Sequence, residues 1–102
     1  MRSPKYEVRL LRAAESDLTD IVAYVSLERP ETALGVLARI DHSLGHLART
    51  PYLGKLPNDD HLLEIGYRCL IVDEYLAFYT VEGRSVFVHR IIHGARDYSA
   101  LF

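Results

Sequence analysis

The chain of 102 residues is 49% hydrophobic and 25% charged, a balance that indicates one globular domain over residues 1–102 and argues against a disordered protein. Its formal net charge of −2 excludes a protein that attracts nucleic acid through a global positive field. Because the sequence has a single cysteine, no apolar run of membrane-spanning length and no signal-peptide pattern, we expect a cytoplasmic protein without an internal disulfide or a membrane partner.

The first half of the chain predicts one strand followed by two helices. Apolar residues alternate with charged ones over residues 6–11, which is the pattern of a strand with one buried face. From residue 18 to residue 25 apolar side chains recur at helical spacing, and this helix should end near Glu28 because Pro30 suits the first turn of a new helix. The second apolar stripe continues to Leu47 and is broken by Pro51, so we expect an antiparallel helical hairpin.

The second half of the chain predicts a loop and three strands. Residues 51–63 are rich in turn-forming residues and should contain no regular element. Strand-like runs at 66–73, 75–81 and 85–93 are separated by two or three polar residues, so they should form an antiparallel meander. Residues 95–102 should add a short C-terminal turn. The predicted fold is therefore α+β: a strand, a helical hairpin covering one side of the sheet, and a three-stranded antiparallel meander.

This order of elements, together with several short motifs, resembles the RelE/ParE family of bacterial toxins, which includes plasmid stabilisation system proteins. The motifs are Tyr6-Glu7-Val8, Asp17-Leu18-Thr19-Asp20-Ile21-Val22-Ala23-Tyr24, Gly66-Tyr67-Arg68, Tyr75-Leu76-Ala77-Phe78-Tyr79 and Arg90-Ile91-Ile92-His93-Gly94-Ala95-Arg96-Asp97-Tyr98. The resemblance spans nearly the whole chain. It implies the growth-inhibiting toxin of a type II toxin–antitoxin system, which needs no cofactor. It also implies neutralisation by a cognate antitoxin, with which such toxins often form hetero-oligomers.

The resemblance leaves two mechanisms open. Members of one branch poison DNA gyrase without cutting anything themselves, whereas members of the other branch cleave messenger RNA in the ribosomal A site. The chain would be an enzyme only in the second case. A third hypothesis is a protein that keeps the toxin fold and binds its antitoxin but has lost toxicity.

RNA cleavage through the ribose 2′-hydroxyl needs a proton acceptor, cations that offset the phosphate charge, and an acid for the leaving oxygen. His93 suits proton transfer because an imidazole readily gains and loses a proton near neutral pH. The candidate catalytic residues, if the chain is a ribonuclease, are Arg68, Arg90, His93 and Tyr98, with Glu64 as a candidate base. The candidate contacts to a phosphate or to the cellular target are Arg68, Arg90 and Arg96.

Two features favour gyrase poisoning over RNA cleavage. The predicted loop has Lys55 as its only lysine or arginine, beside Asp59 and Asp60, so it lacks the cations with which ribonuclease members of the family grip the ribosome. Arg90 and His93 are an odd number of residues apart, so they face opposite sides of a regular strand unless a bulge near the strand end reunites them. We therefore favour a gyrase poison, with the ribosome-dependent ribonuclease as the alternative.

Structural roles compete with these functional ones. Arg68 and Arg90 each suit an ion pair with a carboxylate, and His93 suits a cap on the end of its strand. Arg96 suits a local ion pair in the tail, and Tyr98 suits a packing role. The candidate carboxylates are Glu64, Asp73 or Glu74 for Arg68, Asp97 or an acidic helix residue for Arg90, and Asp97 for Arg96.

Two further features have a metal-binding or a redox interpretation. His42 and His46 stand four apart on the second predicted helix, which is metal-ligand spacing, but without a third ligand nearby no metal site is predicted. Cys69 lies in a predicted strand between apolar neighbours, so we interpret it as a small buried hydrophobic residue and not as a reactive thiol.

Overall fold

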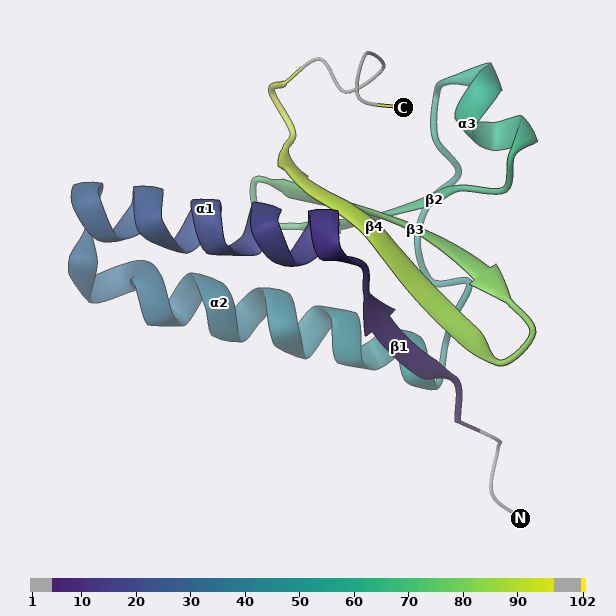
Figure 1. The fold of residues 1–102 in the computed structure, drawn as a ribbon, viewed down its shortest axis with the longest axis horizontal. Helices are drawn as coiled ribbons and strands as arrows, with labels where there is room; N and C mark the ends of the chain where they lie inside the picture. Colours follow the sequence, from purple (N-terminus) through teal and green to yellow (C-terminus); the bar gives the residue numbers. More distant parts are fainter. Residues whose placement is uncertain (1–4, 97–101) are drawn as a thin grey trace.

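A four-stranded sheet lies against a hairpin of two long helices, as Figure 1 shows. The computed structural model describes residues 5–96 and residue 102, so the predicted turn at 95–102 falls largely outside the described residues. The elements in chain order are β1 (Glu7–Leu10), α1 (Arg12–Glu28), α2 (Pro30–Gly45), the 3-10 helix η1 (His46–Ala48), α3 (Asp60–Glu64), β2 (Arg68–Val72), β3 (Tyr75–Glu82) and β4 (Ser85–His93). This arrangement confirms the predicted α+β fold.

The two helices are joined by a single residue. α1 ends at Glu28 as predicted, and Pro30 occupies the first turn of α2, where its missing N–H costs no hydrogen bond. The buried residues of α2 recur at helical spacing and face the sheet; they are Ala33, Val36, Ile40 and Leu44. Within the described residues, no helix combines the length and the apolar composition that crossing a membrane requires.

The sheet has the strand order β1-β4-β3-β2. β2, β3 and β4 form the predicted antiparallel meander, and its two-residue loops carry positive φ angles of 53° at Asp73 and 60° at Gly83, which tight hairpins require. β1 instead runs parallel to β4, with Val8 beside Val86. The first strand of the chain is thereby held at the edge of the sheet by the last one.

The pairing of β3 with β4 contains one irregularity. Val88 lies opposite Tyr79 and Arg90 lies opposite Phe78, so His89 is an extra residue on β4. Such a bulge reverses the side-chain alternation from that point on. Beyond it the register is regular, and His93 lies opposite Tyr75.

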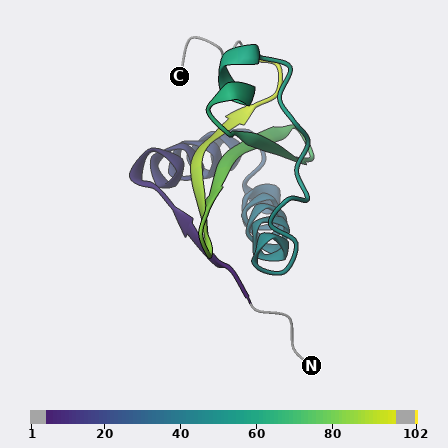
Figure 2. The same cartoon turned by 90° about the vertical axis from the view of Figure 1, so that its right-hand side faces the viewer.

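The sheet buries apolar side chains on both faces. The larger cluster lies between the sheet and the helical hairpin, and its most buried large members are Ile40, Leu47, Tyr79, Val86, Val88 and Ile91. The smaller cluster lies on the other face and consists of Leu62, Tyr67, Cys69, Phe78 and Ile92, with Leu76 and Phe102 packed against it. Figure 2 shows α3, which supplies Leu62, apart from the helical hairpin. Burial on both faces explains why the strands of this sheet are apolar almost throughout.

The prediction that residues 51–63 contain no regular element was wrong at its end. The five-residue helix α3 begins at Asp60, and the side chain of Asp59 caps it by accepting a hydrogen bond of 3.0 Å from the N–H of Leu62. Leu62 is only 1% exposed. An aspartate before a helix and an apolar residue that needs burial together stabilise this short turn.

Candidate functional site

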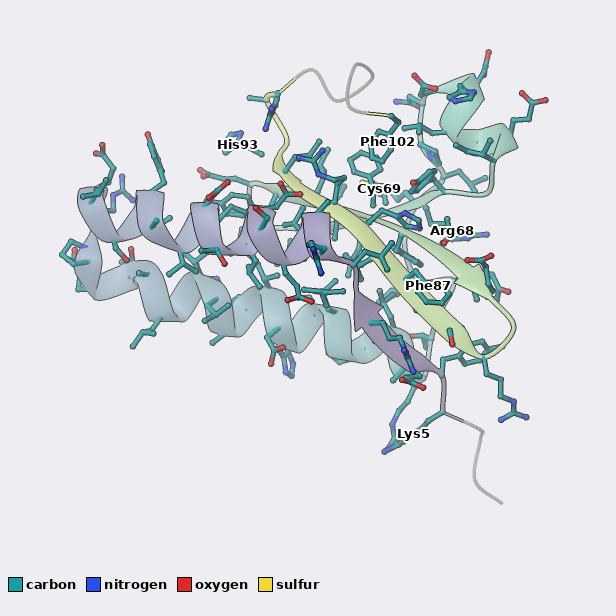
Figure 3. The ribbon with its side chains drawn as sticks, in the orientation of Figure 1. Lys5, Arg68, Cys69, Phe87, His93 and Phe102 are labelled. Atoms are coloured by element: carbon teal, nitrogen blue, oxygen red, sulfur yellow. The ribbon has the colours of Figure 1, made fainter. Side chains whose placement is uncertain are left out.

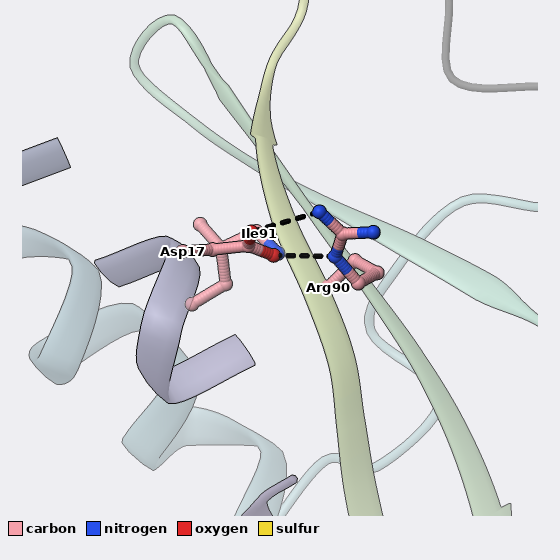
Figure 4. A network of polar contacts seen from close by, with 3 residues as sticks. All are labelled: Asp17, Arg90 and Ile91. Carbon is pink, nitrogen blue, oxygen red and sulfur yellow. Dashed lines mark hydrogen bonds and ion pairs between the residues drawn. The ribbon is translucent and has the colours of Figure 1, made fainter. Parts of the chain in front are cut away.

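Arg90 and Asp17 form the ion pair at the junction of α1 and β4 (Figure 4). The guanidinium donates from Nε to Oδ2 at 2.7 Å and from Nη2 to Oδ1 at 2.8 Å. Both side chains are largely buried, with 22% of Arg90 and 13% of Asp17 exposed. The hydrogen bond with Asp17 raises the pKa of Arg90 above its ordinary value, so the guanidinium is permanently charged and engaged.

The position of Asp17 follows from the end of β1. The backbone N–H of Leu11 donates to the carbonyl of Val88 at 2.9 Å, after which the chain turns into α1 and leaves the edge of β4 without a neighbouring strand. Oδ2 of Asp17 accepts the next N–H on that edge, from Ile91, at 2.9 Å. One carboxylate therefore accepts hydrogen bonds both from a backbone N–H on the strand edge and from the guanidinium of Arg90.

Arg68 lies elsewhere on the sheet, at the start of the edge strand β2. Its Nη1 donates to the carbonyls of Gly54 at 3.1 Å and Tyr52 at 3.3 Å, and its guanidinium lies 5.1 Å from the centre of the Tyr52 ring. Within the described residues it binds these carbonyls and not the carboxylates predicted as partners. Arg68 thus anchors the loop before α3 to the sheet.

His93 ends β4 and is half exposed. Its Nε2 lies 3.6 Å from a carboxylate oxygen of Glu74, its Nδ1 accepts a hydrogen bond of 3.1 Å from the N–H of Ala95, and its ring meets Tyr75 edge to face. The bond to Ala95 is a backbone cap of the strand end, as the structural interpretation predicts. The same imidazole is also exposed enough to meet a partner.

The register shows which candidates share a face. Arg90 lies opposite Phe78 and His93 opposite Tyr75, three residues along β3, so the two side chains leave the sheet from opposite faces. The bulge is at His89 and not near the strand end, so it does not reunite them. Figure 3 shows His93 at one end of the sheet and Arg68 well away from it on β2. The side chains of Arg68, Arg90 and His93 therefore do not meet in one site.

The remaining candidates are exposed or outside the described residues. Arg96 is exposed, and its backbone N–H donates to the carbonyl of His93 at 3.0 Å. Glu64 is the exposed last residue of α3. Tyr98 and the predicted Arg96–Asp97 pair involve residues outside those described. The roles proposed for these groups stay predictions.

A cleft of about 870 Å³ opens between the outer ends of α1 and α2 and the loop joining β2 to β3. Its apolar lining comes from Ile21, Tyr24, Val25, Val36, Tyr75 and Ile91. Charged residues surround that lining, and they are Asp17, Asp20, Glu28, Arg29, Arg39, Asp73, Glu74, His93 and Arg96. Arg39 and Asp73 bridge across it through an ion pair of 2.6 Å. An apolar floor with charges of both signs suits a protein segment better than a phosphate-rich nucleic acid.

Sequence reasoning missed two polar contacts. Asp17 was one of several acidic residues on the first helix, and only the fold singles it out as the partner of Arg90. His89 is held on the face away from the helices, where its Nε2 lies 2.9 Å from the hydroxyl of Thr80 and its ring meets Tyr67 edge to face. Burial lowers the pKa of His89 below its ordinary value, with an opposing contribution from Glu82. Thr80 follows Tyr79, where the register between β3 and β4 shifts. No local sequence signal predicts this bulge.

The structure also bears on the redox interpretation of Cys69 and on the metal interpretation of His42 and His46. Cys69 is 9% exposed, and burial raises the pKa of its thiol to about 11. Within residues 5–96 and residue 102, no three metal-binding side chains lie close enough together to hold an ion. His42 and His46 are both exposed.

The chain matches a known protein family. A family model described as "ParE toxin of type II toxin-antitoxin system, parDE" matches residues 8–98. Among curated proteins, none matches the chain.

Two solved structures share the fold. A chain of the chromosomal ParDE toxin–antitoxin system from P. aeruginosa is similar with a TM-score of 0.75 and 22% sequence identity, over 89% of this chain and 98% of that one. A chain of the toxin–antitoxin complex RelBE2 from Mycobacterium tuberculosis is similar with a TM-score of 0.60 and 22% identity, over 87% of this chain and 98% of that one.

Proposed function

This chain belongs to the ParE toxin family of type II toxin–antitoxin systems, and we propose that it arrests growth by poisoning DNA gyrase and not by cutting RNA. In this proposal residues 1–102 act as a single toxin domain in the cytoplasm. The mechanism needs a binding surface for gyrase and no proton transfer by the chain itself.

The observation that carries the proposal is the engagement of Arg90 by Asp17. A guanidinium that donates twice to a carboxylate has most of its charge offset, whereas stabilising a phosphate during strand cleavage needs a cation free to face it. Arg68 is likewise committed to two backbone carbonyls, on a strand that does not adjoin β4. The described residues therefore supply no assembled set of phosphate clamp, base and acid.

The direct test uses the purified chain in two reconstituted reactions. With gyrase, ATP and supercoiled plasmid, we expect broken DNA covalently bound to gyrase to accumulate. With ribosomes translating a defined message, primer extension should find the message intact. Cleavage at the ribosomal A site without gyrase-linked DNA breaks would overturn the proposal in favour of a ribonuclease. Unimpeded growth of several bacterial hosts that express the chain would instead support the non-toxic antitoxin-binding module.

A substitution of His93 separates the two toxic mechanisms in cells. His93→Gln should leave growth arrest intact, because gyrase poisoning needs no proton transfer. A ribonuclease that used this imidazole would lose about 100-fold or more in cleavage rate. His61→Gln, at another exposed histidine on α3, is the matched control for expression and folding. Loss of arrest in His93→Gln alone, with normal antitoxin binding, would count against gyrase poisoning.

We further propose that the cleft between the helical hairpin and the β2–β3 loop receives the antitoxin. Tyr24 is the most exposed residue of its apolar lining, at 66%, and an exposed aromatic ring beside buried apolar side chains is a typical anchor for a bound helix or strand. The charges of both signs around the lining suit a segment that is itself amphipathic.

Tyr24 and Tyr52 make a matched pair for testing that location. Tyr52 is similarly exposed, at 59%, but lies outside the cleft. Tyr24→Ala should weaken antitoxin binding by about 10-fold or more, measured by titration calorimetry with the cognate antitoxin, whereas Tyr52→Ala should leave affinity nearly unchanged. Equal effects of the two substitutions, or none from Tyr24→Ala, would place the antitoxin elsewhere.

A further inference from the structure

His42 and His46 converge at the C-terminal end of α2. His42 lies in the last turn of the helix, and His46 begins η1 one turn later. Their Nε2 atoms are 3.3 Å apart, and the ring centres are 4.8 Å apart with the planes nearly perpendicular. Both side chains are exposed, so this end of the pair is open to solvent.

This spacing is the one that a metal ion imposes on two imidazoles. A Zn²⁺ ion bound at about 2.0–2.1 Å from each nitrogen in tetrahedral geometry holds the two nitrogens about 3.3–3.4 Å apart. The two Nε2 atoms are therefore already at the separation of a chelating pair before any ion arrives. Pre-arranged ligands bind more tightly because less rotamer freedom is lost.

The electrostatic setting favours a cation. The last carbonyls of a helix carry partial negative charge, which attracts positive charge to its C-terminal turn. Both histidines lie at that end of α2. Imidazole nitrogens select borderline transition ions over Ca²⁺ or Mg²⁺, which prefer oxygen.

We propose that His42 and His46 chelate one divalent transition ion, of the Zn²⁺, Ni²⁺ or Cu²⁺ class, through their Nε2 atoms. Because the described residues place no third side-chain ligand nearby, water or a donor from another molecule completes the coordination. A hydrogen bond between the two Nε2 atoms requires one of the rings to carry its proton on Nε2. On binding, that ring changes tautomer: its Nε2 releases the proton and its Nδ1 takes one up from water, so that the lone pairs of both Nε2 atoms are available to the metal.

A bound ion has a structural consequence. It links the last turn of α2 to η1, so it should stabilise the folded chain by an amount that grows with the logarithm of its concentration above Kd. The two histidines take no part in the proposed toxin mechanism, and neither of them lines the cleft.

The test is titration of Zn²⁺ and Ni²⁺ into the untagged full chain by calorimetry, with thermal unfolding as a second readout. We expect one ion per chain and a higher Tm at saturating ion. His42→Gln and His46→Gln should each weaken binding by about 10-fold or more, because the second ligand no longer adds to the first, and should abolish the rise in Tm.

Two control variants test whether metal binding requires His42 and His46 in particular. His61→Gln removes an exposed histidine from α3 and should leave binding unchanged. Asp41→His combined with His42→Gln keeps the number of histidines but moves one of them to a different side of the helix, and should bind as weakly as His42→Gln. Binding that survives loss of either His42 or His46, or no binding at millimolar ion, would overturn the proposal.

Discussion

Asp17 and Arg90 lie 73 positions apart in the sequence and meet through two hydrogen bonds that fasten α1 to β4. The same carboxylate accepts the N–H of Ile91, so a single side chain completes three contacts at the edge of the sheet. Arg90, which the sequence offered as a candidate phosphate contact, forms in the fold an ion pair that fastens the helical hairpin to β4.

Replacement of Asp17 should therefore destabilise the protein markedly. Asp17→Ala leaves the largely buried Arg90 without its counter-charge and the Ile91 N–H without an acceptor, which should lower the free energy of unfolding by about 2–4 kcal/mol. Urea unfolding followed by circular dichroism measures the change. The exposed pair Glu7–Arg9, in which both side chains are 60% exposed, is the control, and Arg9→Ala should cost no more than about 1 kcal/mol. Similar losses in the two variants would contradict the fastening role.

Gly54 should tolerate no side chain, whereas Gly45 should accept one. A Cβ at Gly54 would lie 2.7 Å from the Tyr79 hydroxyl and 2.8 Å from the Cys69 carbonyl, so Gly54→Ala should destabilise by about 1–3 kcal/mol. Gly45 has helical φ and ψ angles of −60° and −30° and open space around its Cβ position. Gly45→Ala should therefore stabilise by about 0.4–1 kcal/mol. Thermal unfolding of both variants checks the pair, and a gain in Tm for Gly54→Ala would refute this account of the loop.

His89 should make stability depend on pH in mildly acidic solution. Burial lowers the pKa of its imidazole from the ordinary value of 6.5, so below pH 6.5 the unfolded chain takes up a proton that the folded chain does not. Its stabilising contribution is present in full above that pH and is lost as the pH falls through the lowered pKa. Urea midpoints at pH 7.5 and pH 5.5 should differ less in His89→Gln than in the original chain. His61→Gln should keep the original difference, and equal slopes in all three proteins would contradict the assignment.

The Cys69 thiol should react slowly while the chain is folded. Burial raises its pKa to about 11, and the nucleophilic thiolate is then scarce at pH 8. Mass spectrometry after a short treatment with iodoacetamide should find the native chain largely unlabelled and the urea-unfolded chain fully labelled. Rapid labelling of the native chain would mean that β2 opens readily.

The elements of this fold were predictable because their signals are local. Pro30 fixed the boundary between the helices, and turn residues at Asp73 and Gly83 separated the strands of the meander. The helix α3 was missed because five residues are too few for a periodic pattern. Its signal was the capping Asp59 three residues before Leu62.

The arrangement of the site was less predictable because it depends on distant segments. Strand parity indicated that Arg90 and His93 leave opposite faces, and the register agrees with it. The bulge at His89 and the choice of Asp17 as partner come from tertiary packing, since neither glycine nor proline marks the bulge and several carboxylates on α1 were equivalent in the sequence. Roles for Arg68, Arg96 and Tyr98 in a target complex stay predictions.

The parallel pairing of β1 with β4 also sets the order in which the molecule can be completed. Among the described residues β1 pairs with β4 alone, and Val8 lies beside Val86. During synthesis β1 must therefore wait, without its hydrogen-bond partner, until residues 85–88 have left the ribosome. The sheet edge that β1 completes is thus formed late in folding, because its contacts join segments that are far apart in the sequence.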